Sequence, residues 1–374
     1  MKIGIYTQPL RMNYGGLIQA WALQTILHRM GHTVVTFNPS PYSSLSWKRK
    51  PFTYAYRITR HLFDKTKPIF YEKKINEEYD IKSQYLRPFI ANHLNVLEYR
   101  NVKELKESDF DVLIAGSDQV WRPMYNKTYK RTIENAYLDF ARDWNVKRIA
   151  YAASFGTDEW EYNEEDTQEC GRLLQIFKAI SVREQSGIEL CKKYLGRNDV
   201  KWVLDPTMLL DKEEYEQLIP QDVKAPGDLM CYVLDDNFTV SRLIKRIANE
   251  YNYKVFYANS RVKDVSLPIE QRIQPPVGQW LAGFRDAKLV ITDSFHACVF
   301  SMLFHKPFIV IGNRERGYSR FESLVKLFGL ESRLIENETQ FKKSMLAPFS
   351  DDVYKKLEGY RKSSIEFLKN ALDE

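Results

Sequence analysis

Cysteine is scarce in this sequence, and its four cysteines form no recognisable metal-binding or disulfide pattern. Cys170, Cys191, Cys231 and Cys298 are 21, 40 and 67 residues apart, and none belongs to a CxxC pair or stands at a zinc-ligand spacing from a histidine. This spacing excludes a small disulfide-stabilised scaffold and a structural zinc module. We therefore expect neither disulfides nor a metal site, and no cofactor is indicated.

Long apolar runs are also absent. No uncharged apolar stretch approaches the roughly 18 residues that a membrane-spanning helix needs. The first ten residues, MKIGIYTQPL, enter a strand-like pattern directly and lack the apolar core of a secretory signal peptide. We therefore expect a cytoplasmic protein in a reducing compartment.

Basic residues are in small excess, and the excess belongs to a single segment. The chain has 55 Lys and Arg against 49 Asp and Glu, a net charge of +6. Residues 47–74 alone contain nine basic and two acidic residues, a local charge of +7. Because the rest of the chain is nearly neutral and no nucleic-acid-binding module is recognisable, we expect no nucleic-acid partner.

Aromatic residues make up 14% of the chain, and within residues 47–74 they are interleaved with the basic ones. One interpretation is an interfacial element that contacts anionic lipid, which predicts salt-sensitive peripheral binding at the inner face of the cell membrane. The other is a solvated helical insertion that covers the first domain. The basic residues that the first interpretation uses are Lys48, Arg49, Lys50, Arg57 and Arg60.

The length of 374 residues indicates more than one globular core. Apolar strand-like runs alternate with helical patterns, which is typical of βα repeats and a mainly parallel sheet. We predict two Rossmann-like α/β domains facing a central cleft. The expected units are 1–220 with an insertion at about 40–108, 221–350, and a helix at 351–374 that crosses back over the first domain. The predicted strands are 2–6, 33–37, 111–115, 148–153, 179–183 and 201–204, followed by 229–234, 254–258, 288–292 and 307–311.

Turns between a strand and a helix are the first places to search, because open α/β sheets bind ligands at the carboxyl ends of their strands. The first such turn contains Asn13, Gly15 and Gly16. Paired glycines let the backbone approach a ligand closely, but they equally suit a tight turn with positive φ. The turn matches no nucleotide-binding signature.

Two further strand ends in the first half carry polar residues. After one buried strand come three polar residues that suit sugar hydroxyls, Ser117, Asp118 and Gln119, and then Trp121, which could stack on the face of a sugar. A helix N-cap followed by a Trp in the core explains the same residues without a ligand. Arg183 ends a fully apolar strand. It is either a bidentate clamp for carboxylate or phosphate, or a local ion pair with Glu184.

The most informative strand end lies in the second half, where Asp293, Ser294 and His296 stand between a buried strand and an apolar helix. Of the six histidines, only His296 stands at the beginning of a helix with a carboxylate and a hydroxyl nearby in sequence. This placement favours a catalytic role, because an imidazole titrates near neutral pH.

Another turn follows the next strand and is rich in arginine. Arg316, Ser319 and Arg320 lie in this stretch. They are either part of an anion site at a strand exit or a solvated basic turn.

Taken in order along the chain, these segments resemble the polysaccharide pyruvyl transferase family. The resemblance rests on NYGGLIQAWALQ, DVLIAGSDQVW, AISVRE, VLDPTMLL, ITDSFHACVFSMLFHKPFIVI and SRFESLVKLFGLESRLI, and it covers nearly the whole chain. It implies an architecture similar to the two-domain glycosyltransferase-B fold. It also implies transfer of the enolpyruvyl group of phosphoenolpyruvate to two sugar hydroxyls, which forms a cyclic pyruvate ketal and releases phosphate.

By this resemblance, His296 occupies the family's catalytic position and Arg183 its strand-end arginine. We expect His296 to act as acid and base, Arg183 to hold the donor, and Asp293 to orient His296 or accept a hydroxyl proton. Ser294 stands where the family often has an arginine. Either Arg183, Arg316 or Arg320 supplies that anion contact, or the chain belongs to a branch with another donor. The predicted donor-binding residues are Ser294, Arg316, Ser319 and Arg320, in the second domain. The predicted acceptor-binding residues are Asn13, Gly15, Gly16, Ser117, Asp118, Gln119 and Trp121, in the first domain.

The family's pathways imply a surface-polysaccharide precursor as acceptor, with the sugar carried on a lipid. Two other functions fit the same residues. One is a glycosyltransferase of similar fold that uses a nucleotide sugar. The other is a carbohydrate-binding protein without enzymatic activity.

Overall fold

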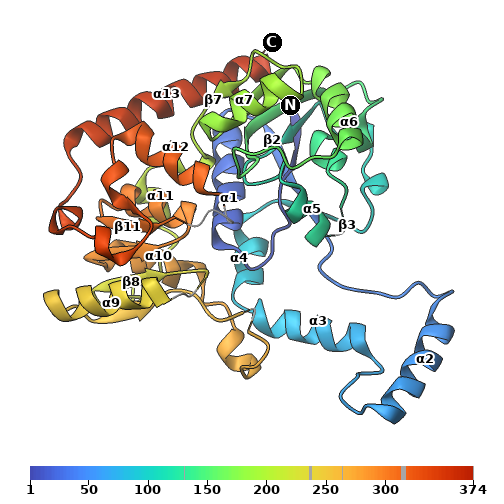
Figure 1. The fold of residues 1–374 in the computed structure, drawn as a ribbon. Helices are drawn as coiled ribbons and strands as arrows, with labels where there is room; N and C mark the ends of the chain where they lie inside the picture. Colours follow the sequence, from blue (N-terminus) through green and yellow to red (C-terminus); the bar gives the residue numbers. More distant parts are fainter. Residues whose placement is uncertain (130, 236–237, 263, 313–316, 374) are drawn as a thin grey trace.

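The computed structural model describes residues 1–129, 131–235, 238–262, 264–312 and 317–373. Two α/β domains lie side by side, each built on a parallel sheet with helices on its faces (Figure 1). The predicted fold class is therefore confirmed. The inner strands are short apolar runs such as Val112–Ala115 and Phe308–Ile311, buried on both sides as parallel strands require.

The first sheet has seven parallel strands in the order β3-β2-β1-β4-β5-β6-β7. Its strands are β1 (Lys2–Tyr6), β2 (Thr33–Pro39), β3 (Val96–Tyr99), β4 (Val112–Ala115), β5 (Lys147–Ala153), β6 (Ala179–Val182) and β7 (Lys201–Trp202). The main helices around it are α1 (Tyr14–Arg29), α4 (Leu86–His93), α5 (Pro123–Thr128), α6 (Glu164–Gln175), α7 (Gln185–Tyr194) and α8 (Lys212–Glu216). The short edge strand β3 was not predicted.

The second sheet has five parallel strands in the order β12-β11-β10-β8-β9. Its strands are β8 (Leu229–Tyr232), β9 (Val255–Tyr257), β10 (Leu289–Thr292), β11 (Phe308–Ile311) and β12 (Leu334–Ile335). Its helices are α9 (Phe238–Tyr251), α10 (Val277–Asp286), α11 (Phe295–Leu303) and α12 (Tyr318–Phe328). Every residue of α11 is buried, so this helix lies in the interior and its first turn is held firmly in place.

The two domains share one hydrophobic core. A single cluster of buried side chains includes Leu17 and Ile18 of α1 together with Trp280 and Phe300 of the second domain. Tyr14 stacks on Trp280 with ring centroids 5.1 Å apart, and its hydroxyl donates to the carbonyl oxygen of Pro275 at 2.7 Å. The start of α1 is thereby placed against the second domain.

The last helix, α13 (Asp351–Asp373), returns to the first domain. Its Ser364 hydroxyl accepts the backbone N–H of Leu204 at 3.0 Å, and Arg361 Nε donates to the carbonyl oxygen of Met208 at 2.9 Å. These bonds connect α13 to the segment that follows β7.

Two helices extend away from both domains. Figure 1 shows α2 (Lys50–Phe63) and α3 (Tyr71–Lys82) projecting from the body, with α2 at the far end. Neither helix contains a buried residue. The expected insertion at 40–108 is therefore not a single unit. Its helices α2 and α3 project from the body, whereas β3 pairs with β2 and belongs to the first sheet. We call the projecting residues 47–82 the arm.

Within the described residues, no helix is long and apolar enough to cross a membrane.

Candidate active site

Both sheets reverse their strand order at a point that faces the other domain. The reversal lies between β1 and β4 in the first sheet and between β8 and β10 in the second. At such switch points the loops after adjacent strands diverge and leave a crevice for a ligand. A cavity of about 1180 Å³ lies here, and residues that follow all four strands line it.

His296 reaches this cavity from the second residue of α11. Its side chain is 8% exposed, and its Nε2 lies 3.6 Å from Oδ2 of Asp205, which belongs to the first domain. The imidazole therefore lies where the two domains meet. The Asp205 carboxylate is close enough to act electrostatically on charge that develops on the ring during a reaction.

Gly15 explains how α1 comes so close to the histidine. A Cβ on Gly15 would lie only 2.1 Å from His296 Nδ1, well inside van der Waals contact. Gly15 is therefore explained by close approach of the backbone to another group and not by a tight turn. That group is the His296 side chain, whereas the sequence suggested a ligand. Gly16 lines the cavity beside Asn13.

We predict that Gly15→Ala lowers activity by about 100-fold while the protein stays folded. The added methyl must displace the imidazole, and a shift of about 1 Å in a reacting group can reduce the rate by this factor. Catalytic rate and the thermal midpoint would be compared with those of Gly359→Ala, where a Cβ meets nothing within 4 Å. Unchanged activity in Gly15→Ala would contradict this account of the glycine.

Asp205 is the central acceptor of the site, and the sequence analysis did not select it. Its Oδ2 accepts hydrogen bonds from Ser117 Oγ at 2.9 Å and Arg183 Nη1 at 2.7 Å. Its Oδ1 accepts the backbone N–H of Thr207 at 3.0 Å and the Thr207 hydroxyl at 2.7 Å. Burial alone would raise the pKa of Asp205, but His296, Arg183 and Thr207 hold the pKa well below its usual range. An aspartate followed by Pro and Thr at a strand exit was the available signal.

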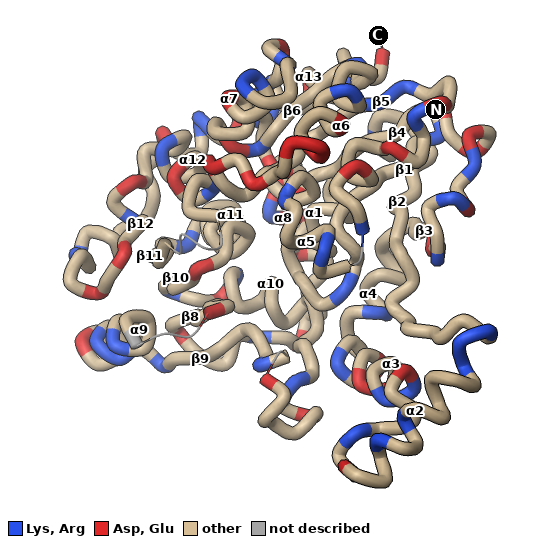
Figure 2. Tube along the Cα trace, turned by 45° about the vertical axis from the view of Figure 1, so that its right-hand side comes forward, with Lys and Arg blue, Asp and Glu red and all other residues tan. Residues whose placement is uncertain are grey.

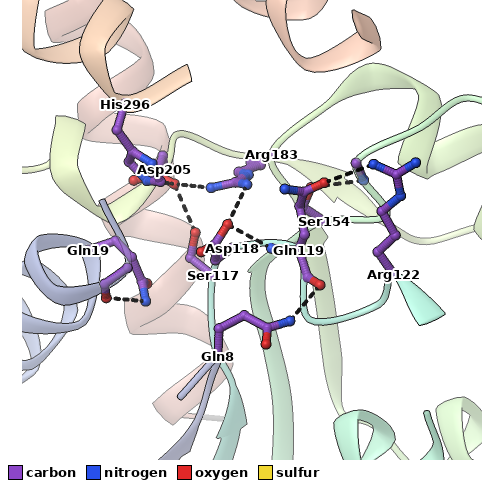
Figure 3. A network of polar contacts seen from close by, with 12 residues as sticks. Gln8, Gln19, Ser117, Asp118, Gln119, Arg122, Ser154, Arg183, Asp205 and His296 are labelled. Atoms are coloured by element: carbon purple, nitrogen blue, oxygen red, sulfur yellow. Dashed lines mark hydrogen bonds and ion pairs between the residues drawn. The ribbon is translucent and has the colours of Figure 1, made fainter. Parts of the chain in front are cut away.

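Arg183 joins Asp205 to Asp118. Its Nη2 donates to Asp118 Oδ1 at 3.0 Å, and its Nε lies 3.9 Å from a carboxylate oxygen of Glu184. Figure 3 shows the chain of contacts from Asp118 through Arg183 to Asp205, with His296 beside it. Burial opposes ionisation of Asp118, yet Arg183, His296 and Arg320 lower its pKa. Asp118 also has a φ of 74°, a left-handed conformation that stores strain and aims its carboxylate at this network.

This geometry does not suit Arg183 as a clamp on the donor. Its side chain is 1% exposed, it does not line the cavity, and carboxylates already bind both Nη atoms. The local ion pair with Glu184 is present but is the longest of its three carboxylate contacts. Arg183 instead holds two carboxylates in position behind the cavity.

Asp293 and Ser294 also line the cavity, at the end of β10. The Asp293 carboxylate accepts the backbone N–H groups of Leu234 at 2.8 Å and Asp235 at 2.9 Å. These bonds hold the loop after β8. The carboxylate that lies 3.6 Å from His296 Nε2 is Asp205, and the role predicted for Asp293 stays a prediction. The Ser294 backbone N–H donates to the Thr292 hydroxyl at 3.0 Å.

Arg320 is a buried arginine that lines the cavity close to His296. It lies in the first turn of α12 and is 7% exposed. Burial and the nearby Arg183 lower its pKa to about 10, so it is still a cation at neutral pH. Ser319 precedes it and is buried, and its hydroxyl has no hydrogen-bond partner among the described residues. Arg316, also predicted to bind the donor, lies outside the described residues.

The predicted acceptor residues are only partly brought together. Asn13, Gly16, Asp118 and Gln119 line the cavity, whereas Ser117 lies behind it and binds Asp205. Trp121 is a core residue: it is fully buried, stacks on Tyr137 at 4.9 Å and donates from Nε1 to the carbonyl oxygen of Ala136 at 3.2 Å.

The cavity has further polar and cationic residues that sequence reasoning missed. Gln8 follows β1, and within the part of the chain that the structure describes its buried Oε1 has no hydrogen-bond partner. Four basic residues line the cavity near the arm: Arg11, Lys82, Arg261 and Arg272. Lys82 ends α3, and Arg272 lies 3.8 Å from Glu78 of the same helix. These residues are scattered in sequence and come together only through the packing of the domains.

The described residues contain no group of three or more His, Cys, Asp or Glu side chains able to hold a metal ion. The four cysteines are buried free thiols.

Comparison with known proteins agrees with this architecture. A protein from Listeria monocytogenes assigned as a UDP-N-acetylglucosamine 2-epimerase is 10% identical, with a TM-score of 0.51 over 97% of this chain and 90% of that chain. UGT89C1 from Arabidopsis thaliana, solved in complex with UDP-L-rhamnose, is 9% identical, with a TM-score of 0.50 over 99% of this chain and 97% of that chain. At these identities the likeness shows the fold alone, which is of the glycosyltransferase-B type.

At the level of sequence, no curated protein matches the chain. The model of one family, polysaccharide pyruvyl transferase, matches residues 13–315. The match runs from the turn before α1 through the strand and helix that present His296, so it includes most of the residues described above. The chain therefore belongs to the polysaccharide pyruvyl transferase family.

Proposed function

We propose that the protein transfers the enolpyruvyl group of phosphoenolpyruvate to two hydroxyls of a sugar in a lipid-linked precursor of a surface polysaccharide. The products would be a cyclic pyruvate ketal and inorganic phosphate. Family membership supports a transferase. The observation that carries the proposal is the position of His296, which faces a large interdomain cavity, has the buried Asp205 carboxylate behind it and shares the cavity with the cationic Arg320.

The reaction needs a proton donor and acceptor at one place. Protonation of the methylene carbon of phosphoenolpyruvate produces a methyl group and an oxocarbenium-like C2. A sugar hydroxyl then bonds to C2, and a second hydroxyl bonds to C2 as the C2–O bond to phosphate breaks. Of the two hydroxyl protons, one replaces the proton given to the methylene carbon and the other leaves with phosphate. His296 can give the first proton and receive a hydroxyl proton in turn.

Asp205 and Arg183 support this exchange without touching the substrate. The anionic Asp205 stabilises the protonated imidazole, while Arg183, Ser117 and Thr207 hold the carboxylate in one orientation. Because all these groups are buried, the site needs little rearrangement when charge develops on His296.

Arg320 and the first turn of α11 are suited to the anionic donor. A guanidinium presents several donors in a plane that matches a carboxylate or phosphate. The first turn of α11, where Phe295 and His296 line the cavity, belongs to the part of a helix whose backbone N–H groups have no partner within the helix and can bind an anion. In the family, an arginine at the position of Ser294 often makes this anion contact. In this chain we assign the contact to Arg320.

The first domain and the arm side of the cavity suit the acceptor. Gln8, Asn13 and Gln119 offer amide groups for sugar hydroxyls. The basic residues at Arg11, Lys82, Arg261 and Arg272 suit phosphate groups that join a sugar to its lipid carrier.

Binding experiments test the donor directly. We expect phosphoenolpyruvate at 100 times its Kd to stabilise the protein by about 2.7 kcal/mol, seen as a rise in thermal midpoint. Arg320→Gln is expected to weaken this binding at least tenfold. Lys326→Gln, in the last turn of the same helix, is the matched control.

The alternatives give different results in the same experiment. Stabilisation by a UDP-sugar and not by phosphoenolpyruvate would replace this proposal with a glycosyltransferase. Stabilisation by neither donor, but by an oligosaccharide, would indicate a carbohydrate-binding protein.

A further inference from the structure

The outer face of the arm helix α2 is the largest set of exposed apolar side chains in the described part of the chain. Phe52 is 80% exposed, Leu62 74% and Phe63 93%. Spacing at 100° per residue places these three on one side of α2 together with Ala55 and Ile58. A soluble surface rarely exposes so many large apolar groups together, and such patches mark contact sites.

The opposite face of α2 is already occupied. The Tyr54 ring packs on Phe70 with centroids 5.6 Å apart. The Arg57 guanidinium makes a bidentate ion pair with the Glu72 carboxylate of α3, with N–O distances of 2.6 and 2.8 Å. His61 Nδ1 is hydrogen-bonded to the carbonyl oxygen of Lys67 at 2.7 Å. These contacts fix the orientation of α2 on α3 and leave its apolar face pointing outward.

Basic residues are frequent next to this apolar face. Residues 47–74 carry a net charge of +7, and Figure 2 marks several Lys and Arg positions along the trace of α2. Lys48, Arg49 and Lys50 stand at the start of α2, Arg60 lies on its flank, and Trp47 just before it is 76% exposed. An apolar face bordered by cations and aromatic rings is suited to the boundary between lipid headgroups and acyl chains.

We propose that α2 binds the surface of a membrane that contains anionic lipid, with Phe52, Leu62 and Phe63 inserted at the headgroup boundary. A second copy of the chain fits less well, because pairing two α2 faces would bring two segments of +7 together. An anionic lipid surface matches both the apolar face and the charge. Arg57 is not counted among the lipid contacts, since Glu72 already binds it.

The arm also relates the membrane to the active site. Helix α3 has 12 residues, a rise of about 18 Å, and ends at Lys82 in the cavity wall. A bound membrane would therefore lie near the basic side of the cavity, where the proposed lipid-linked acceptor would enter. This last step rests on the proposed function, whereas membrane binding itself does not.

Vesicle sedimentation tests the proposal. The full chain would be mixed at 50 and 500 mM NaCl with vesicles of phosphatidylcholine alone or with about 30% phosphatidylglycerol. We expect the protein in the pellet only with phosphatidylglycerol at low salt. Each basic side chain near such a surface is worth roughly a fivefold change in binding, so replacing four should weaken it at least 100-fold.

Three variants make the result specific. The charge variant replaces Lys48, Arg49, Lys50 and Arg60 with Gln and keeps Arg57, so that the contact with α3 survives. The control replaces four exposed lysines elsewhere, Lys103, Lys106, Lys342 and Lys343. The apolar variant combines Phe52→Ser, Leu62→Ser and Phe63→Ser. We expect the charge and apolar variants to stay in the supernatant and the control to sediment like the parent chain.

Several outcomes would overturn the proposal. One is no binding to anionic vesicles at 50 mM NaCl; another is equal sedimentation of the charge variant and the control. A parent chain that is dimeric in solution, and that the apolar variant converts to a monomer, would assign α2 to a contact between copies. Phosphate release in detergent-solubilised acceptor, measured separately, distinguishes failure of membrane binding from failure of the proposed reaction.

Discussion

Replacing His296 with alanine is expected to lower the rate of the proposed reaction, followed as phosphate release from phosphoenolpyruvate, by about 10² to 10⁴, the usual contribution of a positioned acid or base. The fold should persist, because the side chain lines the cavity and makes no strong hydrogen bond within the described residues. Rate and thermal midpoint would be measured on the same preparation. Donor binding should change little, since Arg320 and the α11 N-terminus remain.

His93→Ala is the matched control for this variant. His93 is exposed at the end of α4, where its ring packs on Phe89 with centroids 4.8 Å apart. Its replacement should leave the rate unchanged. Turnover near the parent value in a folded His296→Ala protein would remove His296 from the mechanism.

Replacing Arg183 with methionine is expected to destabilise the protein by about 3 to 5 kcal/mol. The change leaves the buried carboxylates of Asp118 and Asp205 without their shared cation, and removing one partner of a buried ion pair has an effect of this size. The free energy of unfolding would be measured with denaturant. Arg172→Met, which removes a 73% exposed arginine paired with Glu169, should change it by about 0 to 1 kcal/mol.

A second substitution tests whether the loss comes from the uncompensated charge. Adding Asp205→Asn to Arg183→Met should recover part of the lost stability, which a double-mutant cycle reports as a coupling energy. If the two effects simply add, Arg183 does not stabilise Asp205.

The pH dependence of stability gives an independent check. Because folding lowers the pKa of Asp205 and Asp118, their ionisation stabilises the folded parent chain at pH values above about 4 and is lost as pH falls through the lowered pKa values. The contribution of these two carboxylates to the stability of the parent chain should therefore be constant from pH 8 to about 5. It should decrease only at more acidic pH, which denaturant unfolding of the parent chain at each pH would measure.

Sequence reasoning succeeded where the signal was local. Alternating apolar runs and helical patterns predicted both sheets, and they missed only the short strands β3 and β12. His296 was selected because it stands between an apolar strand and a buried helix. The structure places it there, at the cavity. Such features depend on neighbouring residues, and periodicity along the chain encodes them directly.

The sequence interpretation was less successful where the partner of a side chain is distant in sequence. Asp293 is three residues from His296, yet its carboxylate binds the loop after β8. Asp205 takes the place beside the imidazole. Trp121 suited a sugar face by composition, but the chain that follows it folds over its ring and Tyr137 covers it.

The sequence by itself determined the fold class, the family and the strand ends that carry polar residues. These three features depend on short stretches of adjacent residues. Only the tertiary structure decided which of those residues meet. The contacts of Arg183 and Asp205 join residues 65 and 88 positions apart, and they exist because strand order brings β4, β6 and the segment after β7 to one sheet edge. Domain packing then brings the first turn of α11 against that edge, which places His296 beside Asp205.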